Sequence, residues 1–192
     1  MTGLARRRRA LMVKQGGSTP RLPAEYQEVE WIGYEGASKG LNTGIETNSV
    51  NRVEALIAKE TAPSSGTVFP STYLNMTDTR PSTAKWGTIE NVSGSSWTAS
   101  PSFTNETLFD FTVISSTKKD WTYSSYISIG YGSDAYTPRL KFKYMRLYDA
   151  SEVLLFDGVP CYRKLDGKIG MYDVLNSVFR QTNSTWTKGA DI

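Results

Sequence analysis

Hydrophobic and polar side chains alternate along several short segments of the chain, which is the pattern of β-strands with one buried face. The segment LKFKYMRLYD, residues 140–149, shows this alternation most clearly. One predicted face carries Leu140, Phe142, Tyr144 and Arg146, and the other carries Lys141, Lys143, Met145 and Leu147. The same two-residue period predicts strands over 26–32, 50–58, 107–114 and 124–132.

Turn-forming residues separate these segments at short intervals. Glycine, serine and aspartate gather in stretches such as YEGASKG (34–40), DASE (149–152) and LDGK (165–168), which are typical of connections between strands. No amphipathic helix pattern follows residue 22. Many short strands without crossover helices predict an all-β fold, either an antiparallel sandwich or a barrel.

The stretch DGVPCYRKLDGKIGMYDVLNSVFR, residues 157–180, is interpreted as two hairpins that close the sandwich. A strand is expected to end at Asp157 and Gly158, and Pro160 is expected to fix the entry to the next strand. Asp166 and Gly167 predict a hairpin turn, after which IGMYDV returns as a strand.

The first 21 residues differ from the rest of the chain in charge. Six basic residues precede Glu25 with no acid among them, which leaves 16 basic and 19 acidic residues in the body. A polarised chain of this kind favours a basic tail that docks on an acidic partner. We therefore divide the chain into a basic anchoring arm with its linker (1–21) and a β-sandwich domain (22–192).

The arm combines positive charge with a few apolar side chains. Residues 3–15 are predicted to form a short helix or an extended segment, and GGSTPRLP (16–23) is a linker by composition. The residues expected to contact a partner are Leu4, Arg6, Arg7, Arg8, Arg9, Leu11 and Met12. Four consecutive arginines could also bind nucleic acid, but no interleaved aromatic residues accompany them, so we favour a protein partner.

The composition excludes several classes of enzyme and site. The chain has no histidine, so a Ser-His-Asp triad, a Cys-His dyad and a His-ligated zinc are impossible. The single cysteine, Cys161, cannot form an internal disulfide and is expected to be a buried, inert core residue. No apolar run approaches the roughly 20 residues of a membrane span, and the basic start lacks the apolar core of a signal peptide.

Acidic residues offer two further candidate chemistries. Glu28 and Glu30 could face one side of a strand, as a retaining glycosidase requires, but the glucanase pattern E-x-D-x-x-E is missing. Asp157, Asp166 and Asp173 could bind calcium, but their spacing lacks the dense Asp-x-Asp pattern of a loop site, which favours turn and capping roles. We predict no catalytic residue, metal site or cofactor.

Aromatic side chains in the middle of the chain are candidates for glycan binding. Sugar sites combine aromatic faces with amides and carboxylates. The chain supplies Trp86, Trp97, Trp121, Tyr123, Tyr126, Tyr131 and Tyr136 amid serine, threonine and asparagine. Aromatic residues at strand spacing are more often core residues, so we select Trp97 and the turn residues Tyr131 and Tyr136.

Two segments resemble a known family. LPAEYQEVEWIGYEGASKGLNTGI (22–45) and KYMRLYDASEVLLFDGVPCYRKLDGKIGMYDVLNSVFRQTNSTWTKG (143–189) are similar to concanavalin A-like, laminin-G-like jelly rolls found in phages, prophages and gut bacteria. The middle of the chain, about 60–125, matches only as a strand pattern. The resemblance implies a jelly-roll β-sandwich, with virion-surface and adhesive roles as the usual expectation.

These observations together favour a non-enzymatic virion protein of a tailed bacteriophage, which assembles in the host cytoplasm without secretion. The arm would anchor the chain to other virion proteins in an oligomeric assembly, and the jelly roll would face outward and contact cell-surface glycans. Head decoration or head fibre is the first expectation. A tail or baseplate receptor-binding adhesin, a free carbohydrate-binding module and, last, a glycoside hydrolase are the alternatives.

Overall fold

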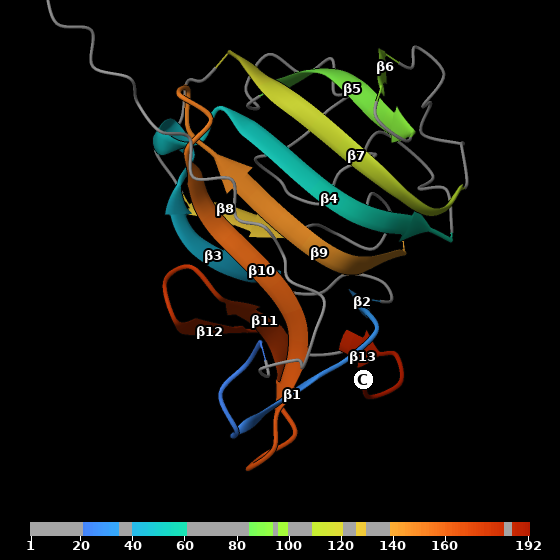
Figure 1. The fold of residues 1–192 in the computed structure, drawn as a ribbon, viewed down its shortest axis with the longest axis vertical. Helices are drawn as coiled ribbons and strands as arrows, with labels where there is room; N and C mark the ends of the chain where they lie inside the picture. The colour runs from blue at the N-terminus through green and yellow to red at the C-terminus, as the bar shows by residue number, and fades with distance from the viewer. Residues whose placement is uncertain are drawn as a thin grey trace, which may run out of the picture.

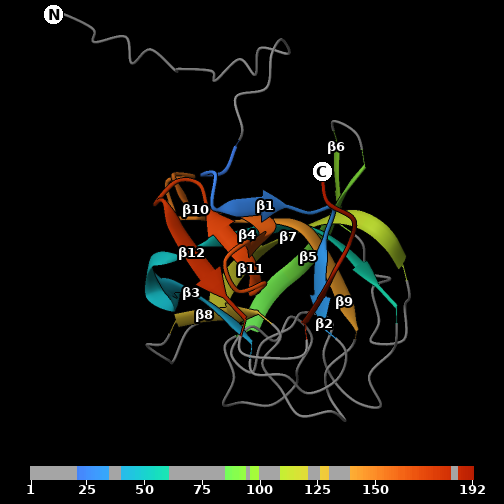
Figure 2. The ribbon, with the colours of Figure 1, turned by 90° about the horizontal axis from the view of Figure 1, so that it is seen from below.

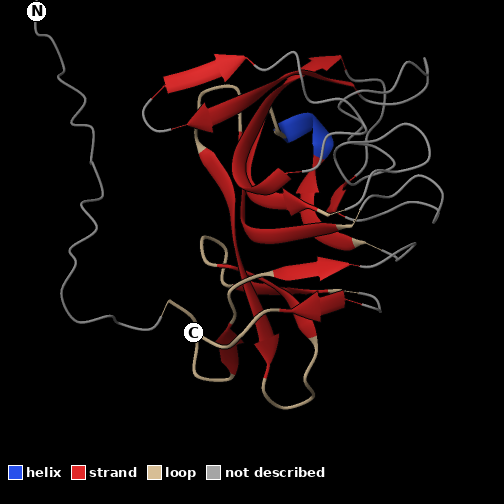
Figure 3. Ribbon diagram, turned by 90° about the vertical axis from the view of Figure 1, so that its right-hand side faces the viewer, coloured by secondary structure: helices blue, strands red, loops and turns tan. Residues whose placement is uncertain are grey.

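The computed structural model describes residues 21–34, 40–60, 85–93, 96–99, 109–120, 126–129, 139–182 and 186–192. Within these ranges the chain forms 13 β-strands and one short 3-10 helix, η1 (Thr47–Ser49). Figure 3 shows that strands dominate the described body. The prediction of an all-β fold is confirmed. No helix in the described ranges is long and apolar enough to cross a membrane.

The strands are named in chain order. They are β1 (Tyr26–Glu28), β2 (Ile32–Tyr34), β3 (Leu41–Glu46), β4 (Arg52–Lys59), β5 (Lys85–Ser93), β6 (Ser96–Ala99), β7 (Phe109–Asp120), β8 (Tyr126–Ile129), β9 (Leu140–Tyr148), β10 (Leu154–Arg163), β11 (Ile169–Asp173), β12 (Val178–Gln181) and β13 (Trp186–Lys188). The predicted strand 50–58 is confirmed as β4, and 107–114 lies largely within β7.

Antiparallel pairing joins the described strands into two sheets. Eleven strands form one sheet along the path β12-β11-β10-β9-β4-β7-β5-β6, to which β1, β2 and β13 are added. The other two strands, β3 and β8, pair with each other. In Figures 1 and 2 this two-stranded ribbon lies behind β9 and β10, so that it faces one side of the large sheet.

The large sheet forks along β10. On one side of this strand, Leu154 to Gly158 pair with β9 and Cys161 to Arg163 pair with β1. After β1 the chain crosses the fork and continues as β2 beside β9 (Figure 1). The prediction of one strand over 26–32 is therefore wrong, because the two halves of this segment pair with different strands.

The main hydrophobic core lies between the two sheets. It contains side chains from β2, β3, β4, β8, β9, β10, β11 and β13, including the fully buried Phe142 and Phe156. A smaller cluster occupies the opposite face of β10 and β11, where Leu22, Val159, Cys161 and Tyr172 are buried. The central strands thus have apolar contacts on both faces, as expected for the middle of a layered β-protein.

A β-bulge in β9 changes which face of the strand is buried. Leu56 pairs with Tyr144 and Ile57 pairs with Phe142, so that Lys143 has no opposite residue in β4. Leu140 and Phe142 are buried before the bulge, whereas Met145 and Leu147 are buried after it. The predicted uniform alternation over residues 140–149 is therefore wrong beyond Phe142, because the extra residue reverses the inward phase.

The segment 157–180 contains two hairpins, but the first predicted break is wrong. β10 runs without interruption through Asp157, Gly158 and Pro160 to Arg163. Pro160 lies opposite Met171 of β11 on one side of β10 and, on the other side, between the residues that pair with β9 and those that pair with β1. Proline is tolerated where a strand changes its partner, because its missing N–H then interrupts no continuous ladder. Asp166 and Gly167 form the β10–β11 turn as predicted, and residues 174–177 form the β11–β12 turn.

Candidate functional site

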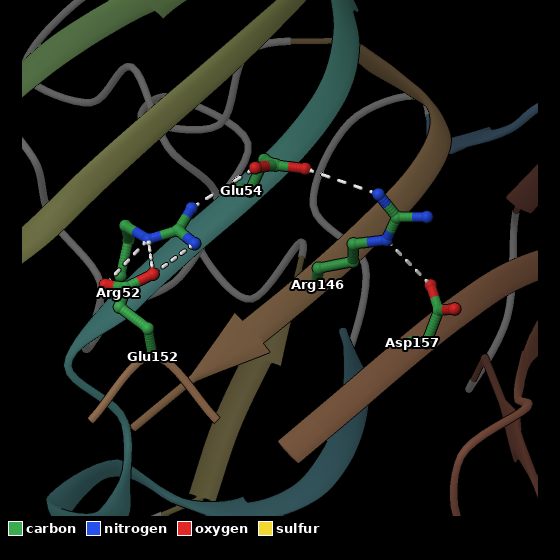
Figure 4. Close-up of polar contacts among 5 residues, drawn as sticks. All are labelled: Arg52, Glu54, Arg146, Glu152 and Asp157. Atoms are coloured by element: carbon green, nitrogen blue, oxygen red, sulfur yellow. Dashed lines mark hydrogen bonds and ion pairs between the residues drawn. The ribbon is translucent and has the colours of Figure 1, made fainter. Parts of the chain in front are cut away.

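A row of charged side chains crosses the face of the large sheet opposite the main core (Figure 4). The strand register aligns Glu54, Arg146 and Asp157 on β4, β9 and β10. Arg146 donates to Asp157 at 3.0 Å and lies 3.5 Å from Glu54. Arg52 contacts Glu54 at 3.2 Å and Glu152 at 2.6 Å. We call these five residues the charge ladder.

The charge ladder is partly buried and satisfied by its own members. The side chains of Arg52 and Glu54 are only 15% and 14% exposed, and the Arg52 guanidinium lies 3.8 Å from the ring centroid of Tyr148. Burial, followed by the nearby Glu54 carboxylate, raises the pKa of Tyr144 to about 12. The ion pairs of the charge ladder connect β4, β9 and β10. Since each charged side chain already has a partner of opposite charge, the ladder is a poor binding site for a charged ligand.

The three aspartates considered for calcium have other roles. Asp173 is buried, and its Oδ1 accepts the N–H groups of Asp157, Leu175 and Asn176 at 3.2 to 3.3 Å, which confirms a capping role. Asp166 accepts from Arg163, and this hydrogen bond lowers the pKa of Asp166 to about 2. Asp157 has an ion-pair role within β10, so the prediction that it ends a strand is wrong.

The two glutamates considered for hydrolysis lie near the start of the body. Glu28 belongs to β1 and contacts Arg21 at 3.5 Å, whereas Glu30 lies in the bend after β1 and is exposed. The backbone N–H of Glu30 donates to Ala190 at 2.9 Å. The bend interrupts the single strand on which the two carboxylates were expected to share a face.

Cys161 is fully buried in the smaller cluster, as predicted, and burial raises the pKa of its thiol to about 12. We expect native protein to react with a maleimide far more slowly than denatured protein at neutral pH, because only the thiolate is reactive. The unfolded thiol ionises near its ordinary pKa, so its contribution to stability is present below about pH 9 and is lost as the pH rises towards 12. Equal labelling rates in native and denatured protein would contradict the burial.

A shallow groove lies where β3, β8 and β12 meet. Its volume is about 470 Å³. We call it the Arg180 groove, and its lining residues are Asn42, Gly44, Tyr126, Phe179, Arg180 and Gln181. Apart from the ring faces of Tyr126 and Phe179, the lining is polar or charged. It joins segments that are far apart in the sequence.

A local distortion of β3 shapes one wall of the groove. Between the pairs Asn42–Ser128 and Glu46–Tyr126, three residues of β3 oppose a single residue of β8. Gly44 takes a φ of 72°, which favours glycine, and its N–H donates to the Asn42 side-chain oxygen at 2.7 Å. The buried Thr43 hydroxyl donates to the Ile127 carbonyl at 2.8 Å and fixes the distortion to β8.

The guanidinium of Arg180 packs directly on the Cα of Gly44. A Cβ at Gly44 would lie 2.5 Å from both terminal nitrogens of Arg180. The Nε of Arg180 is buried and has no hydrogen-bond partner. Among the arginines in the described ranges, Arg21, Arg52, Arg146 and Arg163 each form a side-chain ion pair with an acid, whereas Arg180 forms none with a described residue. The groove therefore holds a cation that has no counter-ion among the described residues.

A second cavity of about 250 Å³ lies between β2 and the start of β9. Its cation, Lys141, forms an ion pair with Glu60 and lies 4.4 Å from the ring centroid of Trp31. Because Lys141 already has an anionic partner, this cavity offers less to a charged ligand than the Arg180 groove does.

The sequence-predicted binding residues fall mostly outside the described residues. Tyr131 and Tyr136 lie outside them, as do Leu4, Arg6, Arg7, Arg8, Arg9, Leu11 and Met12 of the arm. Trp97 belongs to β6 through its backbone, but its side chain is also outside the description.

Tyr126, an aromatic candidate from the middle of the chain whose side chain is described, lines the groove and is 48% exposed. Sequence reasoning missed Asn42, Gly44, Arg180 and Gln181. The only local signal was the turn-like Asn-Thr-Gly at 42–44, which interrupts a strand pattern.

Comparison of the chain with protein-family models, with curated proteins and with solved structures finds no match. The fold is therefore assigned only as an all-β protein with antiparallel sheets.

Proposed function

We propose that the chain is a non-enzymatic structural protein of a bacteriophage virion, either a head decoration or a head fibre. Residues 1–21 would anchor it to other virion proteins, and a concanavalin A-like jelly roll would face outward and adhere to host glycans. The observation that carries this proposal is the segregation of charge, with six basic residues and no acid before Glu25.

The described body offers two features that support this division. Leu22 is 7% exposed and packs into the smaller cluster, so the proposed boundary coincides with the first buried side chain of the described residues. The β3–β8 ribbon faces the large sheet across the main core, an arrangement compatible with a jelly-roll sandwich. Fold alone implies no chemistry, so the adhesive role has to be argued from a site.

Removal of residues 1–21 is expected to leave a folded, soluble β-domain that no longer joins particles. Changing Arg6 to Arg9 to glutamate in the full chain should also abolish attachment, because the arm would then repel an acidic acceptor surface. The measurement is the copy number of the protein on purified particles after mixing with particles that lack it.

The matched control changes four exposed body residues, Lys143, Lys164, Lys168 and Lys188, to glutamate, which alters the net charge by the same amount but leaves the arm intact. Full occupancy by the truncated chain would place the anchor in the body and would overturn the proposed role of the arm.

A tail or baseplate adhesin is the nearest alternative, and the Arg180 groove equally favours a free carbohydrate-binding module. Immunogold labelling of intact particles distinguishes a head protein from a tail or baseplate adhesin, because the label would lie on the head in one case and on the tail in the other. A free module would bind glycan without labelling particles at all.

A further inference from the structure

The Arg180 groove contains a partly buried cation that has no acidic partner among the described residues. Charged side chains that are removed from water are usually paired, so an unpaired one calls for an explanation. The planar guanidinium is held against Gly44 by the distorted turn of β3. Its position is therefore defined before any ligand binds, which reduces the entropy lost on binding.

We propose that the Arg180 groove binds a carboxylated sugar, such as a uronic or sialic acid residue of a glycan, through its carboxylate. A carboxylate can accept two parallel N–H bonds from one guanidinium, and the two terminal nitrogens of Arg180 lie against Gly44 in the lining of the groove. This inference deepens the adhesive part of the proposed function and rests on that part, but it does not depend on the arm.

The other groups in the groove suit the remainder of a sugar ring. Tyr126 lies at the start of β8 with about half of its surface exposed, so its ring face is available for stacking. The side-chain oxygen of Asn42 is occupied by the N–H of Gly44, so Asn42 offers its amide N–H groups. Gln181 is exposed at the end of β12 and can both donate and accept.

These chemical features favour a sugar over an acidic peptide. The groove combines one cation, an aromatic face and two amides, whereas acidic peptides are recognised by clusters of arginines. Its volume of about 470 Å³ also lies within the range of roughly 300 to 1,000 Å³ found for small-molecule sites. Among the described residues that line the groove, Arg180 is the single arginine.

Calorimetric titration of the full chain tests this inference with matched pairs of ligands. The probes are sialyllactose against lactose, and an oligogalacturonate against its methyl ester. At least one acidic member should bind at millimolar concentration or below, and its neutral partner should bind at least about tenfold more weakly, as loss of one charge-assisted bond implies. Weaker binding at higher salt should accompany this preference.

Two variants locate the site. Arg180→Gln should weaken acidic-sugar binding by at least about tenfold and reduce the preference over the neutral partner, whereas Arg21→Gln removes the same charge outside the groove and should change neither. Tyr126→Ala should weaken the acidic and neutral members of a pair alike, because stacking does not depend on the carboxylate. Circular dichroism confirms that each variant is folded.

Three results would overturn the inference: no binding of either acidic probe, equal binding of acidic and neutral members, or unchanged binding in Arg180→Gln. Preferential binding of a poly-glutamate peptide over both acidic sugars would assign the groove to a protein partner instead. Particle attachment of the same Arg180→Gln variant tests the proposed virion role separately from the proposed sugar site. The variant should attach normally through its arm, so a failed groove leaves the virion role standing.

Discussion

Replacing Glu54 by alanine is expected to lower the free energy of unfolding by about 2 to 4 kcal/mol. Glu54 is the central carboxylate of the charge ladder, and its removal leaves Arg52 and Arg146 each without one of their acidic partners (Figure 4). Loss of one member of a buried charge pair typically costs about 3 to 5 kcal/mol, and the 14% exposure of Glu54 reduces this through solvent screening. Urea denaturation at neutral pH measures the change.

Glu152 provides the matched control within the same ladder. Its side chain is 57% exposed although it lies 2.6 Å from Arg52, so Glu152→Ala should cost less than about 1 kcal/mol. Similar losses for Glu54→Ala and Glu152→Ala would show that burial does not set the strength of the ladder. A double-mutant cycle with Arg146→Met isolates the Glu54–Arg146 contribution.

Substitution of Gly170 by alanine is expected to destabilise the fold by about 3 kcal/mol. Gly170 lies in β11 between Cys161 of β10 and Gln181 of β12. A Cβ at this position would overlap the backbone carbonyl oxygen of Arg180 and crowd the ring of Phe179. Because a backbone group cannot rotate away, β12 would have to move, which places the cost at the upper end of the usual range for overpacking.

Gly167→Asn is the control for Gly170→Ala. Gly167 lies three residues earlier in the β10–β11 turn with a φ of 68°, and a Cβ there would meet no atom within 4 Å. Asparagine tolerates this conformation, so the change should cost less than about 1 kcal/mol. A melting temperature that stays unchanged in Gly170→Ala would mean that β12 does not pack against β11 as described.

Strands that are buried on the same face along their whole length could be predicted from the sequence. β4 is the clearest case, because Val53, Ala55 and Ile57 all reach the main core and the alternation is visible in the sequence. The break between β1 and β2 could not be predicted, because it depends on β9 and β10, which lie more than one hundred residues later. The bulge at Lys143 likewise depends on the register with β4.

The candidate site was less predictable than the fold for the same reason. Its polar groups come from three separate segments, around residues 42–44, 126 and 179–181, and none of them forms a motif alone. The burial of Cys161 was predictable, because an isolated cysteine in an apolar strand is usually a core residue. The sequence around Arg180 does not distinguish it from other arginines in strands, because its contact with Gly44 depends on the folded structure.

The fork at β10 also sets an order on the assembly of the body during synthesis. β1 and β2 are made before their partners β10, β9 and β13, which lie within residues 140–192, more than one hundred residues later. The backbone N–H of Ile192 donates to the carbonyl oxygen of Glu28, which also joins β1 to a segment made much later. The edges of β1 and β2 therefore remain unpaired until residues 140–192 have left the ribosome. Binding of a chaperone to the unpaired strand edges would protect the chain most at this stage, because exposed edges promote aggregation.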